Sequence, residues 1–212
     1  RHLAGHPLIY YAIRSAEEST SLDDIAVSSD SSEILDTAMK YGVSNIFQRS
    51  ESLSNDTASK WLVWRDLVEQ YEATVEMTVD YIVDLDVTAP LRRPYHIDAC
   101  VDEATSNQRE VVITCYASDR NPYFNMMEKD TDGRWKIVVS SPKSIVNRQK
   151  APTVYSLSSA VYVVSRSALY LHSHWSNADC SLVQIDREYA TDIDSEYDFR
   201  FIEFLVEKNL VE

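Results

Sequence analysis

The stretch that decides the fold of this 212-residue chain is Tyr81-Ile82-Val83-Asp84-Leu85-Asp86-Val87-Thr88, which reads as an apolar strand ending in polar residues. A helix from Pro94 to about Glu103 and a strand from Glu110 to Tyr116 follow it. The same alternation precedes it, with a helix after Pro7, a strand at 24–30, a helix at 33–41 closed by Gly42, a strand at 43–47, and a helix that Asp56 could cap and that ends near Tyr71. Strands that alternate with helices indicate an α/β domain with a mostly parallel, doubly wound sheet.

The second half of the chain is less regular. It predicts a hairpin of strands 126–128 and 135–139 around the turn 129–133, a strand at 153–164, a strand near 182–185 and an amphipathic helix at 195–207. No repeat or flexible linker divides the sequence. We therefore expect a single domain over residues 1–212, with residues 118–180 forming an excursion from the sheet.

Composition narrows the class of ligand. The chain carries 20 Lys and Arg against 34 Asp and Glu, a formal net charge of −14. Affinity for nucleic-acid phosphates comes from clustered Lys and Arg, so this balance argues against a nucleic-acid partner. The sequence contains only three glycines, Gly5, Gly42 and Gly133, and at these positions neither a G-x-G-x-x-G fingerprint nor a Walker A loop can occur.

Cysteine usage and hydropathy bear on the compartment. Cys100, Cys115 and Cys180 form no C-x-x-C pair, which argues against structural zinc and a disulfide framework and suits a reducing cytoplasm. No apolar run approaches the roughly 18 residues of a membrane span, and no signal peptide is visible, so we expect no membrane partner.

Polar residues gather where the predicted strands end. They are Ser28, Ser29 and Asp30, then Arg49, then Asp84, Asp86 and Thr88, and last Asp192 and Asp194. In open α/β sheets, ligands bind beyond the carboxyl ends of the strands, so these residues are candidates for a site.

Seven segments of the chain occur in a characteristic order. They are RHLAGHPLI at 1–9, VSSD at 27–30, RSESLSNDTAS at 49–59, DVTAPLR at 86–92, NPYFNM at 121–126, RQ at 148–149 with PTVY at 152–155, and TDID at 191–194 with YDF at 197–199. In this order they resemble the acylneuraminate cytidylyltransferases, or CMP-sialic acid synthetases, over nearly the whole chain. The resemblance implies a Rossmann-like, doubly wound mixed sheet of the nucleotide-diphospho-sugar transferase type.

The resemblance also implies an activity. In this family CTP and a nonulosonic (sialic-acid-like) sugar give the CMP-sugar and pyrophosphate, with Mg²⁺ as cofactor. It further implies a cytoplasmic homodimer in which region 118–180 crosses to the partner and contributes to its sugar pocket. The family's first strand and its triphosphate-binding loop fall before the position of Arg1, so we expect the complete protein to carry them upstream.

Asp192 and Asp194 are the expected catalytic and metal-binding residues. Two carboxylates at i and i+2 of an extended segment point to one side, and a few hard oxygen ligands completed by water and phosphate suit Mg²⁺. The alternative is that Asp194 is the N-cap of the helix that follows.

The resemblance assigns Arg148 and Gln149 to the sugar, with Arg148 gripping its carboxylate. A guanidinium suits this task because its fork can donate two parallel hydrogen bonds to a carboxylate. Tyr162 and Trp175 match aromatic residues that line the family's sugar pocket. The alternatives are an exposed surface arginine and two aromatic residues that pack in the core.

Nucleotide and loop contacts complete the set. The resemblance assigns Arg49, Thr57 and Ala58 to the nucleotide, because a helix start offers free N–H groups. It assigns Thr88 to the substrate loop, and Asp86 stands where many relatives carry Gln. Asp86 is therefore a candidate either for substrate contact or as an additional Mg²⁺ ligand.

Two other readings remain open from the sequence. Asp84-Leu85-Asp86-Val87-Thr88 also fits the D-x-D-x-T signature of haloacid-dehalogenase-type phosphatases, with Asp84 as nucleophile and Asp86 as general acid and base. A binding homologue without turnover is the second alternative. Among possible sugars, the segments at 84–86 and 121–126 look most like those of the bacterial legionaminate and pseudaminate branch.

Overall fold

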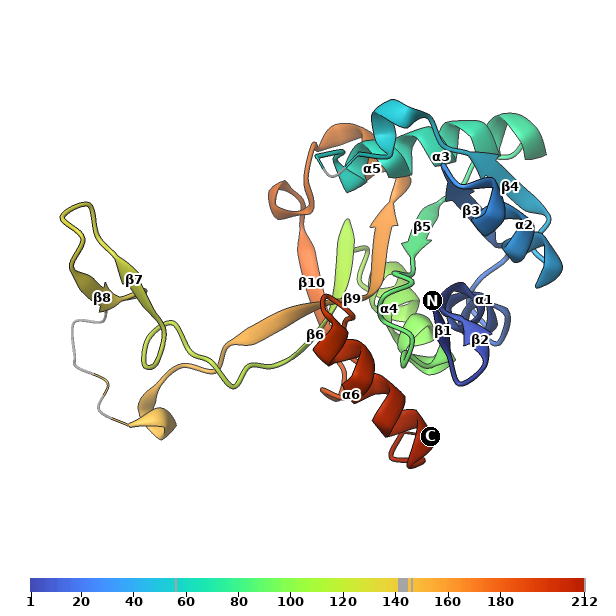
Figure 1. Ribbon diagram of the computed structural model, residues 1–212. Helices are drawn as coiled ribbons and strands as arrows, with labels where there is room; N and C mark the ends of the chain where they lie inside the picture. The colour runs from blue at the N-terminus through green and yellow to red at the C-terminus, as the bar shows by residue number, and fades with distance from the viewer. Residues whose placement is uncertain (56, 141–144, 146, 212) are drawn as a thin grey trace.

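A computed structural model describes residues 1–55, 57–140, 145 and 147–211 of the chain (Figure 1). Its main sheet has the strand order β10-β6-β9-β5, in which β10 and β6 run parallel and β9 runs antiparallel to both β6 and β5. The bounds of these strands are β5 Tyr81–Asp84, β6 Val111–Ala117, β9 Tyr155–Ser165 and β10 Cys180–Gln184.

Helices cover both faces of this sheet. On one face α4 (Pro94–Ser106) packs Ile97 and Cys100 against strand residues that include Val112 and Val163. On the other face α3 (Lys60–Val75) and α5 (Arg166–Leu171) pack against Val111, Ile113 and Val164. Neighbouring strand residues therefore face opposite cores, as the period of two in a strand requires, and the buried parts of β6 and β9 are covered on both faces.

A second, smaller unit is built from the first third of the chain. Strands β3 (Ala26–Ser29) and β4 (Asn45–Gln48) pair in parallel, and α1 (Leu8–Glu17) and α2 (Ser32–Lys40) contribute Ile13 and Ala38 to the apolar cluster beneath them. At the start of the chain, β1 (His2–Leu3) and β2 (His6–Pro7) form a short antiparallel pair. The helix α6 (Glu196–Glu207) packs Ile202 and Leu205 with Leu3 and Leu91.

An arm leaves the sheet between β6 and β9 (Figure 1). Its tip is the hairpin of β7 (Met127–Lys129) and β8 (Trp135–Ile137). Gly133 lies in the hairpin turn at φ +78°, where a side chain is disfavoured, and its N–H donates to the Asp130 carbonyl at 3.0 Å. Met127 and Trp135 on the hairpin are largely exposed, so the arm presents apolar surface away from the core.

The sequence prediction of an α/β fold with a doubly wound mixed sheet is confirmed. The expectation that the sheet is mostly parallel is wrong for its centre, because β9 returns from the arm and pairs antiparallel on both sides. An antiparallel partner needs no crossover helix, so nothing in the local pattern marks this reversal.

Some element boundaries also differ from the prediction. The helix that Asp56 was expected to cap starts at Lys60, with Ser59 as its N-cap, and Asp56 itself lies outside the described residues. The N-cap of α6 is Ser195, whose hydroxyl accepts from the Asp198 N–H, so Asp194 precedes the cap rather than forming it. The helix α5 was not predicted, because six residues directly after a strand give too short a pattern.

None of the helices within the described residues is long and apolar enough to cross a membrane.

His96, on the buried face of α4, makes the fold sensitive to acid. Its Nδ1 accepts a hydrogen bond from the Arg93 N–H at 3.1 Å, which requires an unprotonated nitrogen, and burial lowers the pKa of His96 to about 4. The pKa of an unfolded histidine is about 6.5, so unfolding takes up a proton below that pH. The stability contribution of neutral His96 is complete above pH 6.5 and is lost as the pH falls toward 4.

Urea unfolding at pH 7.5 and pH 4.5 tests this dependence. The wild type is expected to lose up to about 3 kcal/mol more than His96→Gln over this interval, since glutamine keeps an acceptor but does not titrate. Equal losses in the two proteins would show that His96 is not the group responsible.

Candidate active site

Two carboxylates at the end of β5 share one lysine. Asp84 is the last residue of β5, Asp86 follows it, and Lys60 is the first residue of α3. The Lys60 Nζ lies 2.7 Å from a carboxylate oxygen of each aspartate, with hydrogen-bond geometry toward Asp86 and an ion pair toward Asp84. The lysine therefore neutralises one of two neighbouring negative charges.

The aromatic ring of Tyr162 lies against the ammonium group of Lys60. It lies opposite Asp84 in the β5–β9 register, and its ring centroid is 4.8 Å from the Lys60 Nζ, within cation–π range. Burial works to lower the pKa of Lys60, but Asp84 and Asp86 outweigh it and raise that pKa. Burial raises the pKa of Asp86, so the pair is a partly desolvated charge cluster.

Asp192 approaches the same cluster from the loop before α6. The Ser159 hydroxyl donates to Asp192 Oδ2 at 2.8 Å, and the other oxygen, Oδ1, is buried with no hydrogen-bond partner among the residues that the structure describes. The Ile193 N–H donates to the Thr88 carbonyl at 2.9 Å, which fixes this loop against the end of β5. A buried carboxylate oxygen without a partner is the kind of atom that a bound cation satisfies.

Beneath these carboxylates lies a buried arginine. Arg92 is 3% exposed and its Nε donates to the Ala160 carbonyl at 2.7 Å, whereas Nη1 and Nη2 have no hydrogen-bond partner within the described part of the chain. Burial lowers the pKa of Arg92 to about 10, and Asp86, Asp84 and Asp192 act in the opposite direction. The guanidinium therefore stays charged at neutral pH, and its positive charge offsets the negative charge of these three carboxylates.

The carboxylates of Asp192 and Asp194 fit a magnesium ion whose remaining ligands are water and substrate phosphates. Within the described residues no group of three or more His, Cys, Asp or Glu side chains is placed to hold a metal. Mg²⁺ is commonly bound through one or two carboxylates plus water and substrate phosphates, so Asp192 with its unpartnered oxygen and the exposed Asp194 match its needs. Asp86, by contrast, is occupied by Lys60.

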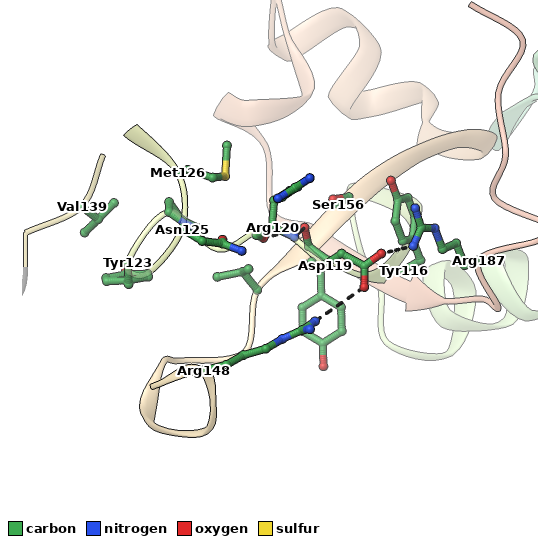
Figure 2. Close-up of a pocket in the computed structure, with 14 residues that line it drawn as sticks. Tyr116, Asp119, Arg120, Tyr123, Asn125, Met126, Val139, Arg148, Ser156 and Arg187 are labelled. Atoms are coloured by element: carbon green, nitrogen blue, oxygen red, sulfur yellow. Dashed lines mark hydrogen bonds and ion pairs between the residues drawn. The ribbon is translucent and has the colours of Figure 1, made fainter. Parts of the chain in front are cut away.

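Arg148 lies in a separate pocket at the base of the arm (Figure 2). The pocket has a volume of about 870 Å³ and is lined by Arg148 from the 3-10 helix η2 (Arg148–Lys150), by the end of β6 and by the start of β9. Gln149 is exposed beside it. From Ser159, which bonds Asp192, back to Ser156, β9 covers about 10 Å at roughly 3.3 Å per residue, so the pocket lies toward the start of β9 from the Asp192 site.

The residues predicted to contact the nucleotide, Arg49, Thr57 and Ala58, form hydrogen bonds with other parts of the chain. The Arg49 guanidinium donates to the Ser28 carbonyl at 2.6 Å, which ties the end of β4 to β3. Thr57 and Ala58 lie in a turn before α3, and both of their N–H groups donate to Asn55, at 3.0 Å each. The expectation that they occupy the helix start is wrong, because the helix begins three residues after Thr57.

Trp175 is partly buried on the side of the sheet that α3 covers. It belongs to the 3-10 helix η3 (Trp175–Asn177) and packs against the apolar cluster around Trp61 and Leu169. The structure thus brings Asp86, Thr88, Tyr162 and Asp192 toward one strand end, with Asp194 in the same loop as Asp192. Arg148 and Gln149 lie at the separate pocket. The other predicted residues are Arg49, Thr57, Ala58 and Trp175, and their side chains or N–H groups contact other parts of the chain. The roles assigned to all of these residues stay predictions.

The sequence profile of the Cytidylyltransferase family matches residues 1–208. The chain belongs to this family. Post-translational flagellin modification protein B of Campylobacter coli is 36% identical to this cytidylyltransferase over 204 residues, which cover 96% of the chain and 86% of the relative. CMP-N,N'-diacetyllegionaminic acid synthase of Campylobacter jejuni is 34% identical with the same coverage.

Among solved structures, CMP:2-keto-3-deoxy-manno-octonic acid synthetase complexed with CTP shares the fold of this cytidylyltransferase. The TM-score is 0.69 at 14% identity, covering 99% of this chain and 91% of the solved one. The match to the Cytidylyltransferase family includes residues 84–88, so it favours a transferase over the phosphatase that the D-x-D-x-T pattern also fits.

Sequence reasoning missed several residues of the charge cluster at the end of β5. Lys60 stands 26 positions before Asp86, and Ser159 stands 33 positions before Asp192, so no local motif joins either pair. Arg92 is the last residue of the quoted segment 86–92. Its place in the loop that follows an apolar strand was the one sequence feature that could have marked it as a site residue.

Proposed function

We propose that this cytidylyltransferase transfers CMP from CTP to a nonulosonic acid and releases pyrophosphate. The observation that carries the proposal is the relative named CMP-N,N'-diacetyllegionaminic acid synthase, which is 34% identical over 96% of this chain. The clustered Asp84, Asp86 and Asp192 at the end of β5 support it, because this is where ligands of open α/β sheets bind.

In the proposed reaction the anomeric hydroxyl of the sugar attacks the α-phosphorus of CTP. A bond forms from that oxygen to phosphorus, the bond to the β-phosphate oxygen breaks, pyrophosphate leaves and the hydroxyl proton is lost. The protein must hold the reactants in line and offset the triphosphate charge. Lys60 and Arg92 reduce the negative charge that Asp84, Asp86 and Asp192 would otherwise present to the nucleotide.

Asp192 and Asp194 would hold the magnesium ion, with Ser159 orienting Asp192 through its hydroxyl. The ion supplies charge neutralisation for the triphosphate and its leaving group. Arg148 would grip the sugar carboxylate, and Tyr162 would form part of the site floor.

We also propose a cytoplasmic homodimer. The projecting arm with exposed Met127 and Trp135 offers an apolar surface for a second copy, which would bring the arm of one subunit to the site of the other. The three cysteines are free thiols, which suits a reducing compartment.

Pyrophosphate release tests the proposed function. The protein encoded by the complete gene is supplied with CTP, Mg²⁺ and a panel of N-acetylneuraminate, legionaminate and pseudaminate derivatives, with a no-sugar control. Release that requires CTP and one sugar is the expected result. CTP binding without release on the whole panel would favour the binding homologue, and phosphate release from phosphorylated sugars would favour a phosphatase.

Arg148→Ala is expected to raise the KM for the sugar by about tenfold or more while the KM for CTP changes by less than about twofold. The guanidinium donates charge-assisted hydrogen bonds to the sugar carboxylate alone, and such bonds contribute about 1.5–3 kcal/mol. Steady-state kinetics with each substrate varied in turn gives both values. Equal increases in the two KM values would contradict the assignment.

A further inference from the structure

The helix α6 has two apolar faces, and the described residues cover only one of them. Ile202 and Leu205 lie on the covered face, in the core. Tyr197, Phe201 and Phe204 follow one another at spacings of four and three residues, so they form a stripe along one side of the helix. Their exposed fractions are 78%, 42% and 49%. A stripe of exposed aromatic rings is typical of a surface that another protein covers.

Acidic side chains flank this aromatic stripe. From Glu196 to Glu207 the helix holds four acids and one arginine, a formal charge of −3. The arginine, Arg200, is already paired with Glu196 at 3.0 Å and with Glu203 at 2.8 Å. The uncovered face of α6 is therefore apolar along its middle and negatively charged beside it. A complementary surface would combine apolar side chains with Lys or Arg.

The arm of this chain has that chemistry. Residues 118–154, which join β6 to β9, contain seven Lys and Arg against four Asp and Glu, a formal charge of +3. The rest of the chain contains 13 Lys and Arg against 30 Asp and Glu. In the hairpin at the tip of the arm, Trp135 is 63% exposed, Met127 is 54% exposed, and the Lys129 ammonium lies 5.1 Å from the centroid of the Trp135 ring. The arm is thus a basic segment of an acidic protein, with apolar side chains at its end.

The hairpin and α6 do not meet within one chain. The hairpin lies at the far end of the arm, away from α6 and from the helices that cover the sheet (Figure 1). None of the four apolar clusters in the described part of the chain contains a residue of the arm. Two copies related by a twofold axis can cover both surfaces at once, because each copy contributes one hairpin and one α6.

We propose that the aromatic stripe of α6 binds the hairpin of a second copy of this chain, and that the contact is reciprocal. The inference rests on the homodimer of the proposed function, and it adds the surface that the arm contacts. Tyr197 follows Asp194 by only three residues, so a hairpin on this stripe lies beside the carboxylate site of the other subunit. The same contact therefore joins the two subunits and holds each arm where the proposed function needs it.

A charged substitution on either surface should separate the subunits. Sedimentation equilibrium of the protein encoded by the complete gene is expected to give a dimer Kd at least about a hundredfold higher for Phe201→Glu and for Trp135→Glu than for the wild type. An aromatic residue at the centre of an interface contributes a factor of about 30 or more, and twofold symmetry places each substitution in the dimer twice. Met39→Glu is the matched control and should leave the Kd unchanged, because Met39 is 51% exposed on a different helix, α2.

A photochemical crosslink tests the contact directly, without relying on a destabilised variant. Trp135→p-benzoylphenylalanine is prepared as isotopically labelled and unlabelled chains, which are mixed in equal amounts and irradiated. Mass spectrometry is expected to join position 135 of one chain to a peptide within Glu196–Glu207 of the other. A crosslink to a different surface, or one within a single chain, overturns the inference. A wild type that stays monomeric at the concentration of the crosslink also overturns it, as does an unchanged dimer Kd for Phe201→Glu.

The failure of the inference differs from the failure of the proposed function, because neither measurement uses CTP or a sugar. If the wild type releases pyrophosphate but position 135 does not crosslink to α6 of a second copy, the inference falls and the transfer activity stands. If the crosslink joins position 135 to α6 of the other chain but no sugar supports pyrophosphate release, the inference stands and the proposed activity falls.

Discussion

Asp192→Asn is expected to reduce pyrophosphate release at least about a thousandfold while the midpoint of thermal unfolding changes by only a few degrees. The reason is that Asp192 Oδ1 is buried without a hydrogen-bond partner in the described residues and so is available to a cation, while Asp84 and Asp86 remain to balance the charge of Arg92. The amide oxygen of asparagine can still accept from Ser159, which now bonds Oδ2 at 2.8 Å. Metal-ion stabilisation of a reacting phosphate is worth several kcal/mol, which corresponds to the stated loss of rate.

Two measurements check this prediction. Turnover is assayed at saturating CTP and sugar over a Mg²⁺ series, and Mn²⁺ binding is followed by the paramagnetic resonance of the free ion in the presence of CTP. Asp192→Asn should weaken Mn²⁺ binding together with turnover. Glu188→Gln, which removes an exposed carboxylate from the same loop, is the matched control and should change neither. Normal turnover in Asp192→Asn would remove Asp192 from the metal site.

The position of Asp192 was predictable from the sequence, because ligands of open α/β sheets bind beyond the carboxyl ends of the strands. Asp84 ends its strand, and Asp86, Thr88 and Asp192 follow strands that end at the same edge of the sheet. The Ile193–Thr88 hydrogen bond places their loops together. Helices and strands were likewise predictable wherever the apolar pattern is long, as in α4 and β9. The pattern specifies which residues are buried but not the direction in which a strand enters the sheet.

The partners of these residues could not be predicted, because they depend on contacts between distant segments. Arg49 has the residue type for a nucleotide contact, yet its guanidinium bonds the Ser28 carbonyl. Trp175 has the residue type for a sugar pocket, and the structure shows it partly buried against the apolar cluster that contains Leu169. Lys60 belongs to no sequence motif, and its ion pairs with Asp84 and Asp86 are seen only in the structure, where the start of α3 meets the end of β5.

Lys60→Met is expected to lower kcat/KM for CTP by about 10- to 100-fold. Removing the ammonium leaves Asp84 and Asp86 as neighbouring negative charges, partly buried and near Asp192, where they oppose a polyanionic nucleotide. At an effective dielectric constant of about 20, a unit charge acts over several ångströms with roughly 1–3 kcal/mol, which gives the stated range. Methionine keeps most of the side-chain volume against Tyr162, so the change is mainly one of charge.

A double-mutant cycle distinguishes charge compensation from direct contact with the nucleotide. If Lys60 acts by neutralising the aspartates, Asp86→Asn should restore most of the activity that Lys60→Met removes, because the double variant has the same net charge as the wild type. If Lys60 instead donates to a phosphate of CTP, the double variant should be as slow as Lys60→Met alone. The pair Lys60 and Asp86 is suited to this test because the hydrogen bond between them, at 2.7 Å, is the contact that both substitutions remove.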